Sequence, residues 1–165
     1  MTMMHTHVTT QPVDAPAARA FAYLRDPINV GRWSLGCFGT EVTDRTGVYT
    51  GRSLFDGARG WFRIDADPAR LIIDYLVGEP RNLMRRISAR IVPGADLGYS
   101  AATCLITLTA WRPHDMSDER WARLCAAHEA EIFLIKSQIE ADALVTSPEL
   151  VSQARCEEHQ TEVPE

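Results

Sequence analysis

From Gly39 to Trp111, apolar and polar residues alternate with the period of two that is typical of β-strands. The alternation predicts six strands, at about Thr40–Asp44, Val48–Phe55, Gly60–Ala66, Arg70–Val77, Arg85–Val92 and Ser100–Trp111. Turn signals such as Asp56-Gly57 and Asp67-Pro68 separate these strands. Connections this short indicate an antiparallel meander, because parallel strands need a crossover of about a dozen residues.

A strand and a helix are expected before the meander. The same alternation predicts a strand over about Thr6–Val13. Asp14 follows it and is a good N-cap, so we expect a helix that Asp14 caps and that runs to about Arg25. Asp26-Pro27 ends this helix, because a residue before proline avoids the helical region. Residues 28–33 are expected to form a second, short helical turn.

The last element is a long helix. After an N-cap at Ser117, residues recur at spacings of three and four in a stripe of Trp121, Leu124, Cys125, His128, Ile132, Ile135 and Ile139. This pattern predicts an amphipathic helix of about 25 residues, or about 37 Å. A helix of that length must lie across something wide, and the sheet is the only wide element. The predicted architecture is therefore α+β, with a bent antiparallel sheet of about seven strands wrapped around the long C-terminal helix.

Composition and charge narrow the class of protein. A chain of 165 residues is about one domain, which we place at 1–146. Residues 147–165 carry five acids against one arginine without apolar periodicity, which predicts a disordered acidic tail. The net charge of −5 argues against a nucleic-acid partner. The longest uncharged stretch, Leu97–Trp111, has 15 residues, too few to span a membrane.

The N-terminus and the cysteines suggest where the protein works. The first residues show no basic segment followed by an apolar run, so no signal peptide is predicted. The four cysteines include no CxxC pair and are expected to be free thiols. We therefore expect a cytoplasmic protein, with a homodimer as an open option.

The opening of the chain resembles a known superfamily. Val13-Asp14-Ala15-Pro16, then Phe21-Ala22-Tyr23-Leu24-Arg25-Asp26-Pro27 and Trp33, is similar to the opening signature of START-like (SRPBCC) proteins. These include polyketide cyclase/dehydrase-like proteins, the Bet v 1 family and lipid-transfer domains. The resemblance covers about residues 8–143 and implies a helix-grip fold with a cavity between the sheet and the C-terminal helix. It does not define a function, because members range from ligand carriers to cyclases.

Residues predicted to line that cavity come from strand alternation and from the helix stripe. The ligand-binding candidates are Trp33, Phe38, Tyr49, Phe62, Tyr75, Ile106, Leu124, His128, Ile132 and Ile135. Trp33 and Phe38 belong to a glycine-rich, aromatic segment that the resemblance places near the cavity entrance. They either gate a lipophilic ligand or, in the case of Trp33, fix the short helix to the core.

Two residues are candidates for catalysis. His128 lies in the middle of the helix stripe, where an imidazole can act as a general acid or base, or orient a ligand carbonyl. The alternative is a core histidine that is hydrogen-bonded within the protein. Asp74 interrupts the apolar run 71–77. If Ile73 and Tyr75 point inward, Asp74 points to solvent; with the opposite parity it pairs with His128.

Other polar residues suggest weaker sites. Arg63, Arg86 and Arg90 lie on strands and form either a solvated face or an anion clamp at the cavity mouth. Glu131 shares a helix face with His128, but two residues do not make a metal site. We predict no metal and no cofactor, since no glycine-rich phosphate loop is present either.

Three functions remain open at this point. The first is binding of a lipophilic or aromatic small molecule in the cavity. The second is an enzyme of the polyketide cyclase/dehydratase type that uses His128, helped by Asp74 or a tyrosine. The third and weakest is a domain that binds a protein partner through an exposed apolar patch.

Overall fold

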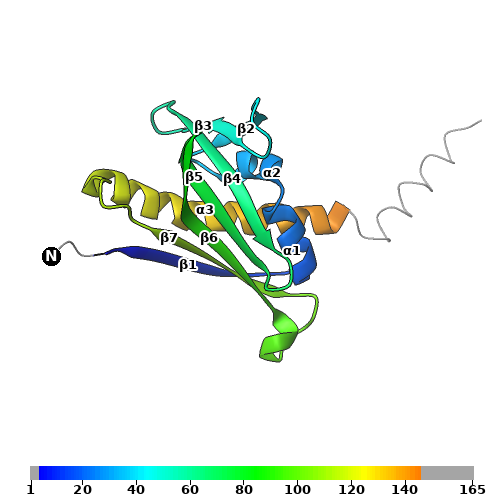
Figure 1. The fold of residues 1–165 in the computed structure, drawn as a ribbon. Coiled ribbons are helices and arrows are strands. Elements are labelled where there is room, and N and C mark those ends of the chain that lie inside the picture. Colours follow the sequence, from blue (N-terminus) through cyan, green and yellow to red (C-terminus); the bar gives the residue numbers. More distant parts are fainter. Residues whose placement is uncertain (1–3, 146–165) are drawn as a thin grey trace, which may run out of the picture.

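The computed structural model describes residues 4–145, and its centre is a seven-stranded antiparallel sheet (Figure 1). The strands follow one another in the order β1-β7-β6-β5-β4-β3-β2, so six of them form a meander and β1 is added beside the last. They are β1 (Thr6–Val13), β2 (Phe38–Val42), β3 (Tyr49–Arg52), β4 (Arg59–Asp67), β5 (Ile72–Glu79), β6 (Asn82–Pro93) and β7 (Cys104–Trp111). The predicted meander is confirmed. The predicted acidic tail, 147–165, lies outside the described residues.

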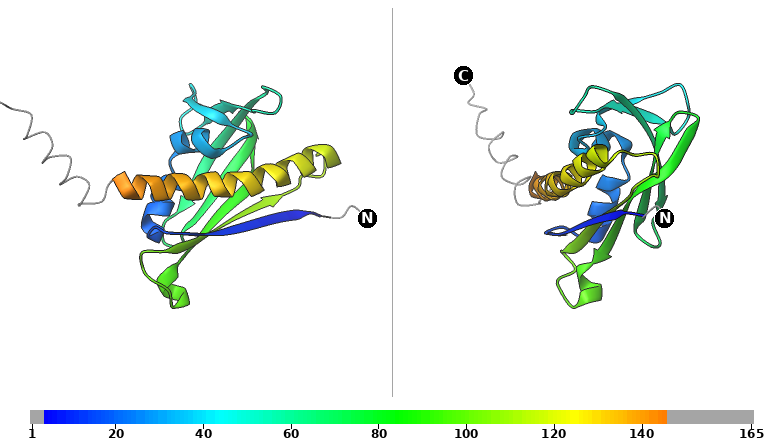
Figure 2. Two further views of the ribbon diagram at one scale, coloured as in Figure 1. Left: turned by 180° about the vertical axis from the view of Figure 1, so that it is seen from behind. Right: turned by 90° about the vertical axis from the view of Figure 1, so that its left-hand side faces the viewer.

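Three helices complete the fold, together with a 3-10 turn, η1 (Gly94–Leu97). The short helices α1 (Ala17–Leu24) and α2 (Pro27–Trp33) connect β1 to β2, and α3 (Asp118–Val145) crosses the inner face of the bent sheet (Figure 2). Ser117 caps α3 as predicted, because its Oγ accepts a hydrogen bond from the Arg120 N–H at 3.2 Å. This is the predicted helix-grip architecture. Within residues 4–145, no helix has the length and apolar character needed to cross a membrane.

Two predicted strands are longer than the observed ones. The segment 48–55 contributes only Tyr49–Arg52, because the chain turns after it: the Ser53 N–H donates to the Ala58 carbonyl at 2.9 Å. The segment 100–111 contributes Cys104–Trp111, because the Thr103 hydroxyl and N–H both bond to the Ser100 carbonyl and form a turn. Side-chain hydrogen bonds stabilise both turns, since the Ser53 Oγ also accepts a hydrogen bond from the Phe55 N–H at 3.2 Å.

The predicted cap of α1 is wrong. Helix α1 begins at Ala17, and Pro16 is at its N-cap position without a side-chain hydrogen bond. The Asp14 N–H instead donates to Glu140 Oε1 at 2.8 Å, which ties the end of β1 to α3. An aspartate does cap α2, since Asp26 accepts a hydrogen bond from the Ile28 N–H at 2.9 Å.

The alternation within each strand decides which side chains form the core. Ile73 and Tyr75 of β5 are buried under the helix, whereas Asp74 between them lies on the outer face, as the parity of the run allows. The side chains that are less than 2% exposed include Leu24, Ile73, Ile91, Ile106, Ile132, Ile135 and Ile139. Burying each such side chain stabilises the fold by about 1.5–3 kcal/mol before entropy is counted.

Candidate functional site

Helix α3 carries two buried ionisable side chains on the face that it turns toward the sheet. His128 is 2% exposed and Glu131 is 3% exposed, among apolar neighbours such as Ile132 and Ile135. Positions 128 and 131 are three residues apart, so both side chains lie on one helix face. Burial of ionisable groups costs free energy unless partners compensate, and it is therefore a physical marker of a candidate site.

Glu131 joins the helix to the loop that follows α2. Its Oε1 accepts a hydrogen bond from the Leu35 N–H at 2.7 Å, and its Oε2 lies 3.8 Å from His128 Nε2. Burial raises the pKa of Glu131 to about 7, although hydrogen bonds from the backbone of Leu35 and Gly36 act in the opposite direction. Near neutral pH this carboxyl group is therefore poised between its acid and its carboxylate form.

His128 is a neutral imidazole at the same pH. Burial, and then the nearby His7, lower the pKa of His128 to about 4. The two imidazole rings lie 5.9 Å apart, His7 coming from β1. The Nδ1 atom of His128 is buried, and within residues 4–145 it has no hydrogen-bond partner. A neutral imidazole with an unpartnered nitrogen is able to bond to a polar atom of a bound molecule.

His7 of β1 contacts Glu129, an exposed residue of the same helix. Its Nε2 lies 3.1 Å from Glu129 Oε1, and the other oxygen of Glu129 accepts a hydrogen bond from the Thr9 hydroxyl at 3.2 Å. These contacts join β1 to α3 beside the buried pair. Among the described residues, no group of three or more His, Cys, Asp or Glu side chains could hold a metal ion.

Two aromatic candidates, Trp33 and Tyr75, lie in the packed core. The Tyr75 hydroxyl donates to the Leu24 carbonyl at 2.8 Å, and burial raises the pKa of this phenol, which keeps it a donor. The Trp33 ring packs edge-on against Tyr75 at 5.8 Å. Trp33 is 3% exposed, and its indole nitrogen has no hydrogen-bond partner among the described residues. The contact with Tyr75 fixes α2 to the core.

The remaining candidates divide between the core and the edge of the sheet. Phe62 is buried and packs against the half-buried Tyr49 of β3, with ring centroids 5.7 Å apart. Leu124 is also half-buried, and Phe38 at the start of β2 is 43% exposed. Ile106, Ile132 and Ile135 are fully buried. The half-buried candidates thus come from β3 and from the first half of α3.

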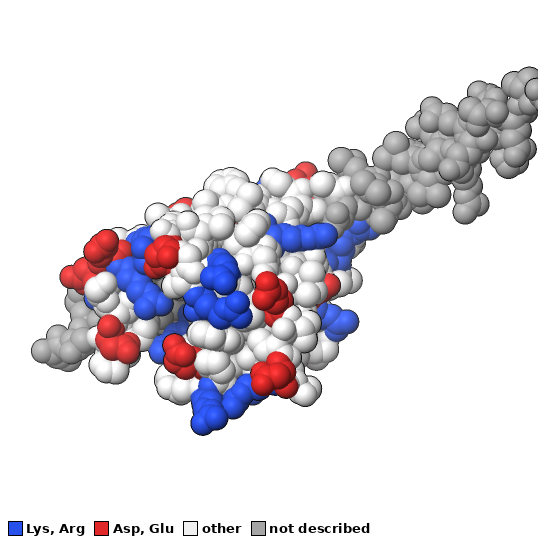
Figure 3. All heavy atoms as spheres, turned by 90° about the horizontal axis from the view of Figure 1, so that it is seen from above, with Lys and Arg blue, Asp and Glu red and all other residues white. Residues whose placement is uncertain are grey.

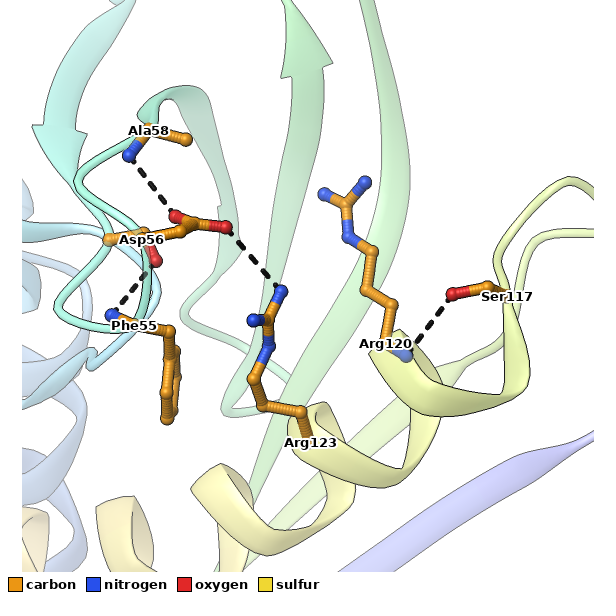
Figure 4. A network of polar contacts seen from close by, with 7 residues as sticks. Phe55, Asp56, Ala58, Ser117, Arg120 and Arg123 are labelled. Carbon is orange, nitrogen blue, oxygen red and sulfur yellow. Dashed lines mark hydrogen bonds and ion pairs between the residues drawn. The ribbon is translucent and has the colours of Figure 1, made fainter.

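A loop between β3 and β4 meets the start of α3 (Figure 4). Asp56 Oδ2 lies 3.5 Å from Arg123 Nη2, and the Arg123 guanidinium lies 5.2 Å from the centre of the Phe55 ring. Hydrogen bonds from Ser53 and Ala58, and then the charge of Arg123, lower the pKa of Asp56. The same loop contacts the segment after α2, because the Leu54 N–H donates to the Leu35 carbonyl at 2.9 Å. Residues 53–58 thereby connect α3 to the loop that Glu131 holds.

The structure does not bring Asp74 to His128. Asp74 lies on the outer face of β5, and its carboxylate forms an ion pair with Arg85 Nε at 2.8 Å. Glu131 takes the place beside the histidine instead. As a metal ligand, the role weighed for it above, Glu131 has too few partners among the described residues, but the spacing 124, 128, 131, 135 puts it on the buried stripe of the helix. That spacing is the signal that could have identified it.

Several solved structures have a fold similar to that of this chain. A START superfamily protein from Mycobacterium smegmatis matches with a TM-score of 0.60 at 13% identity, over 83% of this chain and 98% of that one. The Zhui aromatase/cyclase from Streptomyces sp. R1128 matches with a TM-score of 0.59 at 20% identity, over 84% and 94%. Ara h 8.0201 matches with a TM-score of 0.55 at 16% identity, over 83% of this chain and 98% of that one.

These similarities confirm the predicted START-like, Bet v 1-like fold, and at such identities they show the fold alone. No family model and no curated protein matches the chain.

Proposed function

We propose that the chain binds a hydrophobic or aromatic small molecule between the sheet and the first half of α3. The observation that carries this proposal is the buried His128–Glu131 pair, in which one histidine nitrogen has no partner among residues 4–145, with the half-buried Leu124 one helix turn away. Binding sites of this kind are mostly apolar with a few polar groups that fix the orientation of the ligand. The polar pair favours a ligand that carries a carbonyl or hydroxyl oxygen.

The two polar groups would act on that oxygen in different ways. A protonated Glu131 carboxyl can donate a hydrogen bond, and the neutral His128 imidazole can accept or donate one according to its tautomer. Leu124 and Tyr49 would contact the apolar part of the ligand at the more exposed side of the site. Burying two ionisable groups costs free energy. In this proposal a bound ligand offsets that cost by completing their hydrogen bonds.

A second candidate function is an enzyme of the aromatase/cyclase or dehydratase type. Its support is the protonation pattern: near neutral pH His128 is a free base and Glu131 is partly protonated, 3.8 Å away. Ring closure and loss of water both need a proton taken from carbon and a proton given to oxygen. His128 would be the base and Glu131 the acid. The fold shared with an aromatase/cyclase is compatible with this chemistry but does not assign it.

Native mass spectrometry of the purified protein, followed by solvent extraction, tests the proposal. We expect either a discrete co-purified lipophile or a rise in melting temperature with an added aromatic ketone or poly-β-ketone. His128→Ala and Glu131→Gln should weaken that binding, whereas Asp74→Asn on the outer face is the matched control and should not. Turnover of the ketone that both variants abolish would favour the enzyme. The proposal fails if neither binding nor turnover is found, or if Asp74→Asn weakens binding as much as Glu131→Gln.

A further inference from the structure

An arginine-lined pocket lies on the opposite side of the sheet from the His128–Glu131 pair. It is an open pocket of about 400 Å³, and three of its lining residues are the arginines Arg45, Arg63 and Arg81. Arg63 belongs to the outer face of β4, because its neighbour Phe62 is buried in the core. The pocket is therefore separate from the proposed ligand site.

Three segments that are distant in sequence form this pocket. Arg45 and Thr46 come from the turn between β2 and β3, Arg63 from β4, and Pro80 and Arg81 from the turn between β5 and β6. The two turns are joined directly, since Arg45 Nη1 donates to the Pro80 carbonyl at 3.0 Å. Figure 3 views the molecule from the side where β2 and β3 lie in Figure 1, and both basic and acidic side chains are spread over that face.

The three arginines concentrate positive charge around the pocket. Within residues 4–145, no carboxylate forms an ion pair with any of the three arginines, although Asp74 pairs with Arg85 on the same face. Asp44 and Glu79 stand beside the two turns in sequence but do not line the pocket. Three like charges that converge on one hollow repel one another, and a bound anion would relieve that repulsion.

From this arrangement we infer that the pocket is a binding site for the phosphate or diphosphate group of a small molecule. Guanidinium groups bind phosphate through paired hydrogen bonds, and three of them match a multivalent oxyanion better than a single carboxylate. Thr46 offers a hydroxyl, while Val48 and Leu83 offer apolar contact to the rest of the ligand. The small volume of the pocket and the net charge of −5 favour a small ligand over a nucleic-acid strand.

Titration with inorganic pyrophosphate at constant ionic strength tests this site, with calorimetry as the readout. Pyrophosphate should bind, and acetate should bind far more weakly. Arg63→Gln and Arg81→Gln should each lower the affinity about tenfold or more, because each removes a charged hydrogen-bond donor. Arg63→Lys should fall between the wild type and Arg63→Gln, since it keeps the charge but loses the fork.

Arg90→Gln is the matched control, because Arg90 is an exposed arginine on the sheet that does not line the pocket. It should leave pyrophosphate binding within about twofold of the wild type, as loss of a distant, screened charge implies. The inference is overturned if the wild type does not bind pyrophosphate, if acetate binds equally well, or if Arg90→Gln weakens binding as much as Arg63→Gln. All these variants change exposed residues, and their melting temperatures confirm that they fold.

Discussion

The two halves of α3 lie on the same sheet but bury different kinds of surface. In the second half, Ile132, Ile135 and Ile139 are at most 1% exposed and complete the core. In the first half, Leu124 remains half-exposed, and the buried positions next along the stripe are His128 and Glu131. A helix that served only to close the core would be expected to carry aliphatic residues along its whole length. The second half therefore completes the core, and the polar first half is where we propose that a ligand binds.

The largest expected effect is a difference in stability between two truncations, one in each half of α3. Ile135→Ala should lower the free energy of unfolding by about 2–5 kcal/mol, because it leaves a cavity in a packed core. Leu124→Ala should cost about 1 kcal/mol or less, since its side chain is already partly hydrated. Urea unfolding of both variants measures the contrast. If both variants lose the same free energy of unfolding, the first half of α3 is packed as tightly as the second, and the proposed difference between the two halves is wrong.

The pH dependence of stability tests the buried pair. Glu131 has a pKa of about 7 in the folded state against 4.5 for an ordinary carboxyl, so the native state keeps a proton that the unfolded state loses. Its contribution to stability is therefore complete below about pH 4.5 and is lost as the pH rises toward 7. His128 has a pKa of about 4 against 6.5, so its contribution is complete above pH 6.5 and is lost as the pH falls toward 4.

The two slopes oppose each other between about pH 4.5 and 6.5, and single variants separate them. Glu131→Gln should leave a protein whose stability rises with pH from about 4 to 6.5. His128→Gln should leave one whose stability falls from about pH 4.5 to 7. Each change is on the order of 3 kcal/mol, at about 1.4 kcal/mol for each pKa unit. Chemical unfolding across this range gives the slopes, and parallel profiles for the two variants would contradict the assignment.

The smallest expected effect concerns the loop 53–58 at the start of α3. Arg123→Gln removes both the ion pair with Asp56 and the contact with the Phe55 ring. Exposed ion pairs contribute little to global stability, so the melting temperature should hardly change, while amide exchange within 54–58 should become faster. Arg120→Gln is the control, because the Arg120 side chain lies nearby without an ion pair to Asp56 (Figure 4). If the two variants exchange alike, Arg123 does not hold the loop.

The sequence predicted the fold well because its signals are local and repeated. Alternation over β2–β7 and the stripe on α3 each involve many residues, so a few exceptions do not hide them. The wrong predictions concern positions where a single long-range contact determines the local structure. Asp14 matched the preference for an N-cap, but the helix begins only at Ala17, and the Asp14 N–H binds a distant carboxylate, Glu140. Local patterns contain no information about such a partner.

The candidate site was less accessible to sequence reasoning for the same reason. His128 was identified because it interrupts an apolar stripe, a signal contained within one helix. The contact of Glu131 with the Leu35 N–H depends on how the loop after α2 folds against α3, and the proximity of His7 to His128 depends on the pairing of β1. The place of Asp74 followed from strand parity, once the burial of Ile73 and Tyr75 was known.

The pairing of β1 with β7 has a consequence for the synthesis of the protein. The Thr10 and Thr107 hydroxyls lie 2.8 Å apart although 97 residues separate them in the chain. A ribosome releases β1 first, and this strand has no partner until nearly the whole meander has emerged. Contacts between such distant segments slow folding and leave strand edges exposed in the meantime. We therefore expect that nascent chains ending before Cys104 remain sensitive to protease, and that protection appears only once β7 and α3 have left the exit tunnel.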